Sequence, residues 1–201
     1  MRRWELLRYA LHASSALPLA WLLAAALGLG GQSLGADPVE KLLRETGWWG
    51  LTLLVASLAV TPLRVLSGRN PVLSLRRPLG LWGFAYATLH FTIYLVLDRQ
   101  LAWTEIVGDL AKRPYIMAGM GAVLALIPLA ATSTARAMRA LGRRWQTLHQ
   151  LAYVAAVLAV LHFALQVKKD LAEPMLYATA LTVLLGWRVW RRLRRERAAA
   201  P

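Results

Sequence analysis

Residues 148–165 read LHQLAYVAAVLAVLHFAL, an apolar run that two histidines, His149 and His162, interrupt. A helix needs about 20 predominantly apolar residues to cross a bilayer, and this run with its flanks has that length. Ionisable side chains inside a membrane are costly and usually mark a functional site. The run therefore predicts a transmembrane helix with two functional imidazoles.

The composition of the whole chain is that of a membrane protein. Of its 201 residues, 58% are hydrophobic and 17% are charged, whereas about a quarter of the residues of a soluble domain are charged. The net charge of +14 comes from basic clusters between apolar runs, a pattern typical of inner loops, so nucleic-acid binding is not expected. The chain has no cysteine, which excludes disulfides, thiolate catalysis and iron–sulfur clusters and leaves histidine or carboxylate as metal ligands.

The distribution of apolar stretches predicts an all-α integral membrane protein, a bundle of six transmembrane helices in one domain over residues 1–201. The first stretch is not expected to be a cleaved signal peptide, because its apolar core is long. The segment LAWTEIVGDLAKR between the third and fourth spans predicts a short interfacial helix, and no internal repeat is obvious. The predicted spans are residues 9–29, 47–66, 79–97, 114–131, 146–166 and 174–191.

The basic residues predict the orientation of the bundle. With a cytoplasmic N-terminus, 17 of the 24 lysines and arginines lie on the inner side, and eight of the ten acidic residues lie on the outer side. Cytoplasmic loops carry an excess of lysine and arginine. Both termini are therefore predicted to be cytoplasmic.

Two histidines are predicted to lie at the same depth. At about 1.5 Å per residue, His90 lies about 12 Å from the outer end of its span at Asp98, and His162 about 9 Å from its outer end at Lys168. His149 lies about 20 Å further in by the same rise. Two facing imidazoles in a helical bundle can ligate a haem iron axially; the alternative is that each histidine hydrogen-bonds a carbonyl or hydroxyl group. On a straight helix His149 and His162 are about 140° apart, so both face protein only if neighbours surround the helix or it bends.

Several segments together resemble the MsrQ (formerly YedZ) family, the haem-binding membrane subunits of bacterial periplasmic methionine-sulfoxide reductase systems, in the wider ferric-reductase-like transmembrane group. The resemblance covers about residues 60 to 175. The segments are RRPLGLWGFAYATLHFTIYLVLD, KRPYIMAG, PLAATS and LGRRWQTLHQLAYVAAVLAVLHF.

The resemblance implies a multi-pass b-type cytochrome of the bacterial inner membrane with one or two haem b groups. It implies an electron-transfer subunit rather than the catalytic sulfoxide reductase. Electrons would come from the quinone pool, or from a flavin such as FMN supplied by a cytoplasmic flavin reductase. They would pass to the periplasmic molybdopterin subunit MsrP, which repairs oxidised periplasmic proteins. His90 and His162 are the expected ligands of the outward haem, and His149 would ligate an inward haem or help bind the flavin or quinone.

The sequence departs from the wider group on the third span. Ferric reductases and NADPH oxidases carry a histidine pair on both haem helices, but Arg77 and Arg76 stand thirteen and fourteen residues before His90. Arginine stays protonated and is not expected to ligate iron. Arg76 and Arg77 are either positive-inside charges or ligands of a haem propionate or a flavin phosphate. No flavin and nicotinamide domain follows the sixth span, so the donor is expected in trans.

Two other functions stay open at this point. One is a haem-containing transmembrane ferric reductase that reduces external iron directly. The other is a non-redox transporter or assembly protein that uses its histidines for proton relay or packing. Transporters often carry carboxylates near the bilayer midplane, and no Asp or Glu lies near the middle of any predicted span.

The charge asymmetry predicts the outcome of reporter fusions. A fusion at Pro201 should be active only as a cytoplasmic reporter and one in the loop 98–113 only as a periplasmic reporter, because basic residues concentrate on the inner side. Paired fusions to alkaline phosphatase and a fluorescent protein measure this. A periplasmic C-terminus would contradict the predicted orientation.

Overall fold

The computed structural model describes residues 2–31, 33–167 and 170–198, and most of these residues are helical, which confirms the all-α class. Lys168 and Lys169, which the charge count assigns to the outer side, lie outside the described residues. Short helical turns cover Leu29–Gly31, Asn70–Leu75 and Tyr94–Asp98. The α-helices are α1 (Arg2–Ala26), α2 (Pro38–Ser67), α3 (Arg76–Ile93), α4 (Trp103–Lys112), α5 (Pro114–Ala131), α6 (Ala135–Leu141), α7 (Arg143–Leu148), α8 (Leu151–Gln166) and α9 (Ala172–Ala198).

Among the described residues, five helical segments are long and apolar enough to cross a membrane, and they correspond to the first five predicted spans. The predicted sixth span, 174–191, lies within the helix α9, but α9 is not among the five segments. Its apolar run is short, because arginines follow from Arg188 onward. The five segments are Trp4–Ala26, Pro38–Ser67, Asn70–Asp98, Pro114–Ala131 and Arg143–Gln166.

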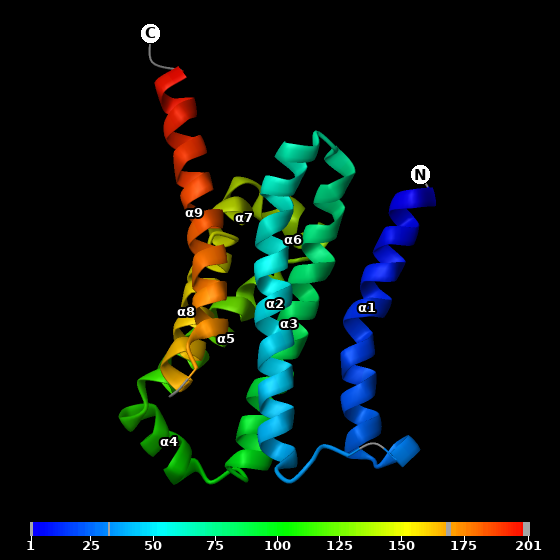
Figure 1. Cartoon of the computed structure of the whole chain (residues 1–201). Helices are drawn as coiled ribbons and strands as arrows, with labels where there is room; N and C mark the ends of the chain where they lie inside the picture. Colours follow the sequence, from blue (N-terminus) through cyan, green and yellow to red (C-terminus); the bar gives the residue numbers. More distant parts are fainter. Residues whose placement is uncertain (1, 32, 168–169, 199–201) are drawn as a thin grey trace.

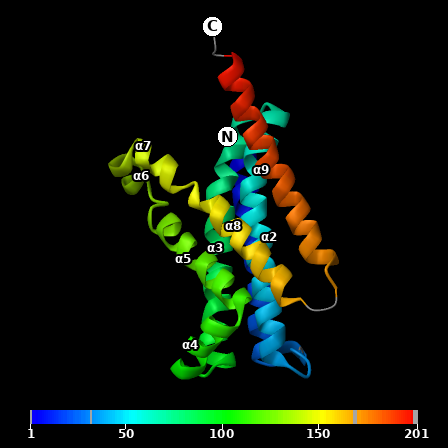
Figure 2. The ribbon, with the colours of Figure 1, turned by 90° about the vertical axis from the view of Figure 1, so that its left-hand side faces the viewer.

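The long helices run side by side, with both chain termini at one end of the bundle and α4 at the other (Figure 1). Helix α2 packs mainly against α3, and α5 mainly against α8; α9 lies along α8 and α2. Figure 2 shows α8 crossing the bundle obliquely beside these helices. Helix α1 packs less closely, against α3. The fold is thus built around two closely packed helix pairs.

Small residues allow the first pair to pack closely. A Cβ atom on Gly83 of α3 would lie 3.1 Å from the backbone nitrogen of Leu54 on α2, and one on Gly50 would lie 3.3 Å from that of Ala87. Helices in a membrane gain little from hydrophobic burial and associate by such close packing. The glycines that the sequence contains at these positions therefore determine which helix faces are in contact.

Local signals explain the ends of α2. The Asp37 carboxylate accepts a hydrogen bond from the Glu40 backbone N–H at 2.9 Å, and Pro38 occupies the first turn, where its missing N–H costs nothing. The helix ends at Gly68, whose φ of 65° is left-handed and favours glycine. These signals set the length of the helix that contacts α3.

The predicted fifth span is not one straight helix. Helix α7 ends at Leu148 and α8 begins at Leu151, so that His149 and Gln150 form a turn between them. The turn interrupts the straight helix that the 140° separation of His149 and His162 assumes. Both imidazoles face the protein, since His149 hydrogen-bonds Thr132 and His162 hydrogen-bonds Tyr115.

The expected short helix is present as α4, and an ion cluster fixes it to its neighbours. Asp109 of α4 lies 2.6 Å from the Arg99 Nε atom and 2.9 Å from the Arg113 Nε atom, and its carboxylate accepts a hydrogen bond from the Tyr94 hydroxyl at 3.1 Å. A hydrogen bond to the Tyr115 hydroxyl and the nearby Asp109 charge raise the pKa of Arg113. Asp109 therefore holds α4 beside the end of α3 and the start of α5.

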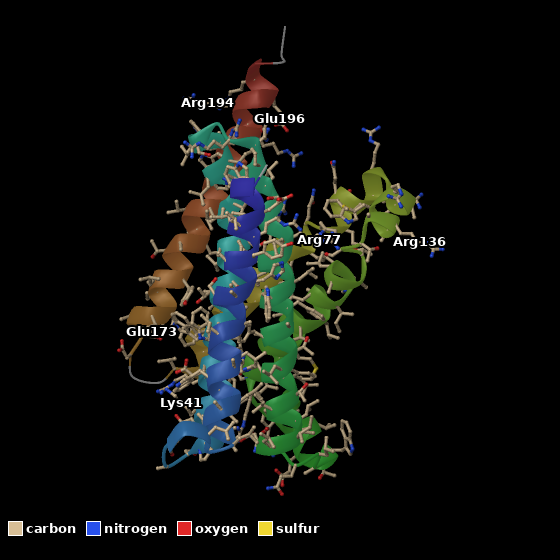
Figure 3. The ribbon with its side chains drawn as sticks, turned by 90° about the vertical axis from the view of Figure 1, so that its right-hand side faces the viewer. Lys41, Arg77, Arg136, Glu173, Arg194 and Glu196 are labelled. Carbon is tan, nitrogen blue, oxygen red and sulfur yellow. The ribbon has the colours of Figure 1, made fainter. Side chains whose placement is uncertain are left out.

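Charged residues gather at the two ends of the bundle. Arg77, Arg136 and Arg194 lie toward the end that carries the termini, whereas Lys41 and Glu173 lie toward the opposite end (Figure 3). Many large apolar side chains between the ends are exposed. Such an apolar girdle is what a lipid-facing surface requires.

Replacing Asp109 tests the ion cluster. Asp109→Asn should lower the free energy of unfolding by about 3 kcal/mol, because two arginines lose the only charge they share in a mostly buried position. Thermal unfolding of the purified protein in detergent measures the change. Glu105→Gln, at an exposed position on the same helix, is the control, and an equal effect of both variants would contradict the proposed role.

Candidate functional site

The structure brings His90 of α3 and His162 of α8 together. Their ring centroids are 5.9 Å apart and the ring planes are inclined by 82°. The two residues are 72 positions apart in the sequence, so only the packing of α3 near α8 makes them neighbours. Their common depth, predicted from helix rise, agrees with this geometry, while their role as metal ligands stays a prediction.

The hydrogen bonds of the two rings define their tautomers. The Nδ1 atom of His90 lies 2.9 Å from the Leu43 carbonyl oxygen, and the Nδ1 atom of His162 lies 2.7 Å from the Tyr115 carbonyl oxygen. A carbonyl oxygen can only accept, so each Nδ1 carries the proton and donates it. Each Nε2 atom is then an unprotonated nitrogen with its lone pair free. In metal sites, a hydrogen bond of this kind from the other ring nitrogen fixes the orientation of the imidazole.

A glycine on the neighbouring helix makes room for each ring. A Cβ atom on Gly47 of α2 would lie 3.1 Å from the Nδ1 atom of His90, and a Cβ atom on Gly119 of α5 would lie 2.8 Å from that of His162. Any larger residue would push the ring away from its carbonyl partner. The sequence did not predict that either glycine contacts a histidine.

The two halves of the site repeat the same contacts. Each histidine donates to a carbonyl oxygen 47 residues earlier in the chain, and each has its glycine four residues after that carbonyl. The same Leu-His-Phe triplet occurs at 89–91 and 161–163. The pair α2–α3 and the pair α5–α8 thus present equivalent histidines, a repeat that the sequence does not make obvious because few other residues match.

A cavity of about 630 Å³ surrounds both rings, within the range of roughly 300–1,000 Å³ that ligand sites occupy. A metal–imidazole bond is about 2 Å long, so two imidazoles on opposite sides of one ion have ring centres roughly 6 Å apart. The observed 5.9 Å fits this requirement. Among the described residues no group of three or more His, Asp or Glu side chains could hold a metal. The site therefore offers two axial nitrogens and space around the axis, which fits a planar metal macrocycle.

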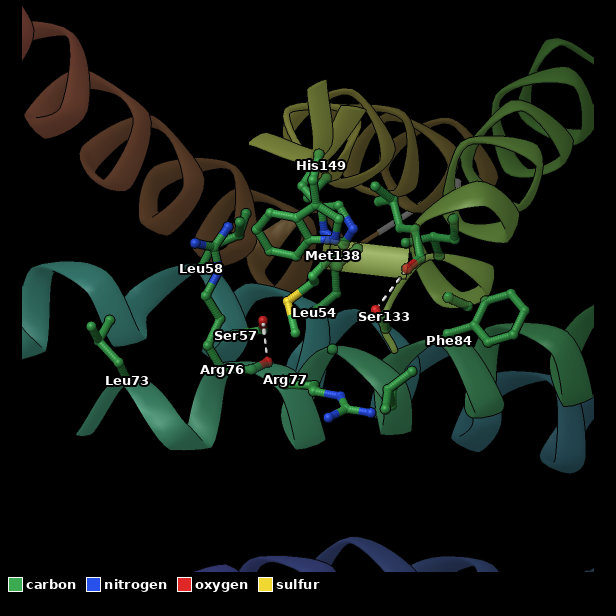
Figure 4. Close-up of a pocket in the computed structure, with 17 residues that line it drawn as sticks. Leu54, Ser57, Leu58, Leu73, Arg76, Arg77, Phe84, Ser133, Met138 and His149 are labelled. Atoms are coloured by element: carbon green, nitrogen blue, oxygen red, sulfur yellow. Dashed lines mark hydrogen bonds between the residues drawn. The ribbon is translucent and has the colours of Figure 1, made fainter. Parts of the chain in front are cut away.

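A second, smaller cavity of about 200 Å³ lies toward the end of the bundle that carries the chain termini. It brings together the other predicted residues: His149, Arg76 and Arg77 line it, with Met138 and Trp145 (Figure 4). Leu54 and Leu126 line both cavities, so the two are direct neighbours. The sequence placed His149 far from His90, and the structure separates them in the same way.

His149 is held differently from the other two histidines. Its Nε2 atom lies 3.0 Å from the Thr132 hydroxyl oxygen, and that hydroxyl donates to the Pro128 carbonyl oxygen at 2.6 Å. The hydroxyl oxygen must then accept from His149, so Nε2 carries the proton. The ring also stacks on Trp145, with centroids 3.9 Å apart and planes inclined by 26°. His149 thus lacks the free Nε2 atom and the glycine contact of the other two.

His12, the remaining histidine, is separate from both cavities. Its Nδ1 atom accepts a hydrogen bond from the Trp82 indole N–H at 3.0 Å, at an exposed position between α1 and α3. Met138 also lines the smaller cavity and was not predicted, because it belongs to no recognisable motif.

Comparison with known proteins identifies the family to which the chain belongs. Residues 46–160 match the family described as "Ferric reductase like transmembrane component". The chain is similar to the protein-methionine-sulfoxide reductase heme-binding subunit MsrQ of Xanthomonas campestris pv. campestris strain 8004, with 48% identity over 95% of this chain and 89% of the relative. The protein of the same name from Xanthomonas axonopodis pv. citri strain 306 is 48% identical over 94% of this chain and 88% of the relative. That from Ralstonia nicotianae is 52% identical over 78% and 73%. No solved structure matches the chain.

The contact of Gly119 with His162 can be tested by adding one methyl group. Gly119→Ala should displace the His162 ring, because the new Cβ atom would lie 2.8 Å from its Nδ1 atom, and should weaken retention of the predicted haem by about 10- to 100-fold. Absorbance of the purified variant during competition with apomyoglobin measures retention. Gly121→Ala is the matched control, since its Cβ atom would meet only the flexible end of Leu158. Equal retention in both variants would contradict the role of Gly119.

Proposed function

Because the chain belongs to the MsrQ family of ferric reductase-like transmembrane proteins, we propose that it is a b-type cytochrome that carries electrons across the bacterial inner membrane to a methionine-sulfoxide reductase. The acceptor is the periplasmic molybdopterin subunit MsrP, and the electrons serve the repair of oxidised periplasmic proteins. The chain itself transfers electrons and does not reduce the sulfoxide.

One observation carries the proposal: two histidines with free Nε2 atoms face one cavity, with ring centres separated by 5.9 Å. His90 and His162 are the residues that would hold the haem b iron. The carbonyl groups of Leu43 and Tyr115 keep each ring in the ligating tautomer and increase the basicity of its Nε2 atom. Bound haem supplies a one-electron couple at its iron. Apolar side chains such as Leu51 line part of the cavity.

The orientation of the chain makes the haem site face outward. Six spans with both termini in the cytoplasm put the arginine-rich end inside, in keeping with the excess of basic residues in inner loops. His90 and His162 then lie in the outer half, near the periplasmic acceptor. The inner cavity with His149 lies toward the cytoplasmic donor.

The inner cavity binds the electron donor rather than a second haem. His149 donates its Nε2 proton to Thr132 and stacks on Trp145, so the nitrogen that His90 and His162 keep unprotonated is engaged in a hydrogen bond here. Arg76 and Arg77 supply positive charge beside it. A reduced flavin such as FMN, delivered by a cytoplasmic flavin reductase, or a quinol fits such a cavity. Because Leu54 and Leu126 line both cavities, the donor and the haem are adjacent.

Histidine substitutions separate the two cavities. His90→Ala and His162→Ala should each abolish the same haem absorbance component, because each removes one axial ligand, and the double variant should lose nothing further from it. His149→Ala should retain that component and slow reduction by flavin or quinol. Visible spectra with haem-to-protein ratios and stopped-flow reduction measure both effects. Loss of the haem in His149→Ala together with retention in His162→Ala would contradict the assignment.

A further inference from the structure

Arg188 of α9 lies inside the bundle, although its neighbours Arg191 and Arg192 belong to the basic C-terminal end. Its Nη2 atom donates a hydrogen bond to the Leu58 carbonyl oxygen of α2 at 2.6 Å. Its guanidinium lies over the Tyr153 ring of α8, 4.7 Å from the centroid. Arg188 thus connects α9 with the two helix pairs.

A proline explains one of these contacts. Pro62 lies inside α2 four residues after Leu58 and has no N–H to donate to the Leu58 carbonyl oxygen. Within a membrane such a freed backbone group needs another partner. The Nη2 atom of Arg188 is that partner, so part of the Arg188 side chain has a structural role.

The rest of the guanidinium is not accounted for by this role. Among the described residues, the Nη1 atom of Arg188 is buried without a hydrogen-bond partner. A buried donor without a partner is costly, and a charged one more so. Neither Arg188 nor Arg76 forms an ion pair with a carboxylate in the part of the chain that the structure describes. The inner half of the bundle therefore contains positive charge without a protein counterion.

The second cation is Arg76 rather than Arg77. In Figure 4 the guanidinium of Arg76 extends toward Leu58, whose carbonyl group binds Arg188, whereas that of Arg77 extends along α3 in another direction. Arg76, His149 and Leu58 line the same cavity, and the Leu58 carbonyl oxygen accepts the hydrogen bond from Arg188. Two guanidinium groups beside one cavity without a carboxylate partner favour an anion between them.

We propose that Arg76 and Arg188 together bind a phosphate monoester at the edge of the inner cavity. A phosphate monoester carries about −1.5 to −2 charges at pH 7, which balances two guanidinium groups, whereas a carboxylate or a phosphodiester carries one. Planar guanidinium groups bind phosphate oxygens bidentately. The inference rests on the proposed function, since the ligand it names is the phosphate group of FMN; a lipid with a phosphomonoester headgroup has the same chemistry.

Flavin titrations of the haem-loaded full-length protein test the site. FMN and riboflavin differ only in the phosphate group, so quenching of flavin fluorescence should give a dissociation constant about 10- to 100-fold lower for FMN. Arg76→Leu and Arg188→Leu should each reduce this preference to near one. Arg192→Leu is the control, because Arg192 is exposed and pairs with Glu196, and it should keep the preference. A retained preference in Arg188→Leu would overturn the proposal.

A double variant separates phosphate binding from folding. Arg188→Leu alone frees the Leu58 carbonyl group and can destabilise the bundle. Pro62→Ala restores a backbone N–H at position 62, so the variant Pro62→Ala with Arg188→Leu should regain thermal stability. It should still bind FMN no better than riboflavin. Recovery of the FMN preference in the double variant would show a purely structural role for Arg188 and would overturn the proposal.

A second experiment, with lipids, shows whether the bound phosphate belongs to a flavin or to a lipid headgroup. The protein is placed in nanodiscs with phosphatidic acid, a monoester, or with phosphatidylglycerol, a diester, and lipid retention is measured by native mass spectrometry. The unmodified protein can prefer phosphatidic acid over phosphatidylglycerol without preferring FMN over riboflavin. If that lipid preference depends on Arg76 and Arg188, the same site binds a lipid phosphate. If the unmodified protein shows neither preference, the proposal is overturned. The haem absorbance of every variant reports the proposed cytochrome separately, because these arginines do not contact His90 or His162.

Discussion

The paired-histidine site depends on one interaction that occurs twice, the hydrogen bond from a histidine Nδ1 atom to a backbone carbonyl oxygen of a neighbouring helix. His90 donates to Leu43 at 2.9 Å and His162 to Tyr115 at 2.7 Å. Each bond fixes the tautomer and the direction of the ring. Without them either nitrogen could carry the proton, and the two Nε2 lone pairs would have no reason to face one cavity.

The helix packing follows from this constraint. A carbonyl group of α2 or α5 can receive the imidazole only if the helices approach closely, and Gly47 and Gly119 permit that approach. The glycines lie one helical turn after the accepting carbonyl groups, so each ring lies against bare backbone. Two helix pairs with equivalent contacts then present their histidines to one another, much as the two ligands of one axial site require.

The two cavities differ in the side chains that line them. The larger cavity has two histidines with unprotonated Nε2 atoms and a mixed lining that includes Glu40 and Arg44, whereas the smaller cavity has an inverted histidine tautomer, an aromatic stack and arginines. His162 lies 72 positions after its equivalent, His90. The residue 72 positions before His149 is Arg77, so an arginine stands where the repeat would place a second histidine on the third span. A cation at the position of a ligand favours an anionic cofactor or substrate over a second iron.

Some of this could be predicted from sequence. Hydropathy alone located five spans, with 114–131 matching its helix from end to end, and helix rise paired His90 with His162, because depth in a bilayer is nearly linear in residue number. The break at His149 could not be predicted, since LHQL contains neither proline nor glycine and tertiary contacts with Thr132 and Trp145 fix it. The sequence alone does not distinguish Arg188 from the other arginines of the C-terminal segment. Its contact with the Leu58 carbonyl oxygen, which Pro62 leaves free, is visible only in three dimensions.

A high-resolution cryo-electron microscopy map of the haem-loaded protein tests the central claim most directly. The account predicts an iron bonded to the Nε2 atoms of both His90 and His162, each at about 2 Å, with both Nδ1 atoms still donating to the carbonyl groups of Leu43 and Tyr115. An iron bonded to only one of these histidines, or to His149 in place of either, would contradict it.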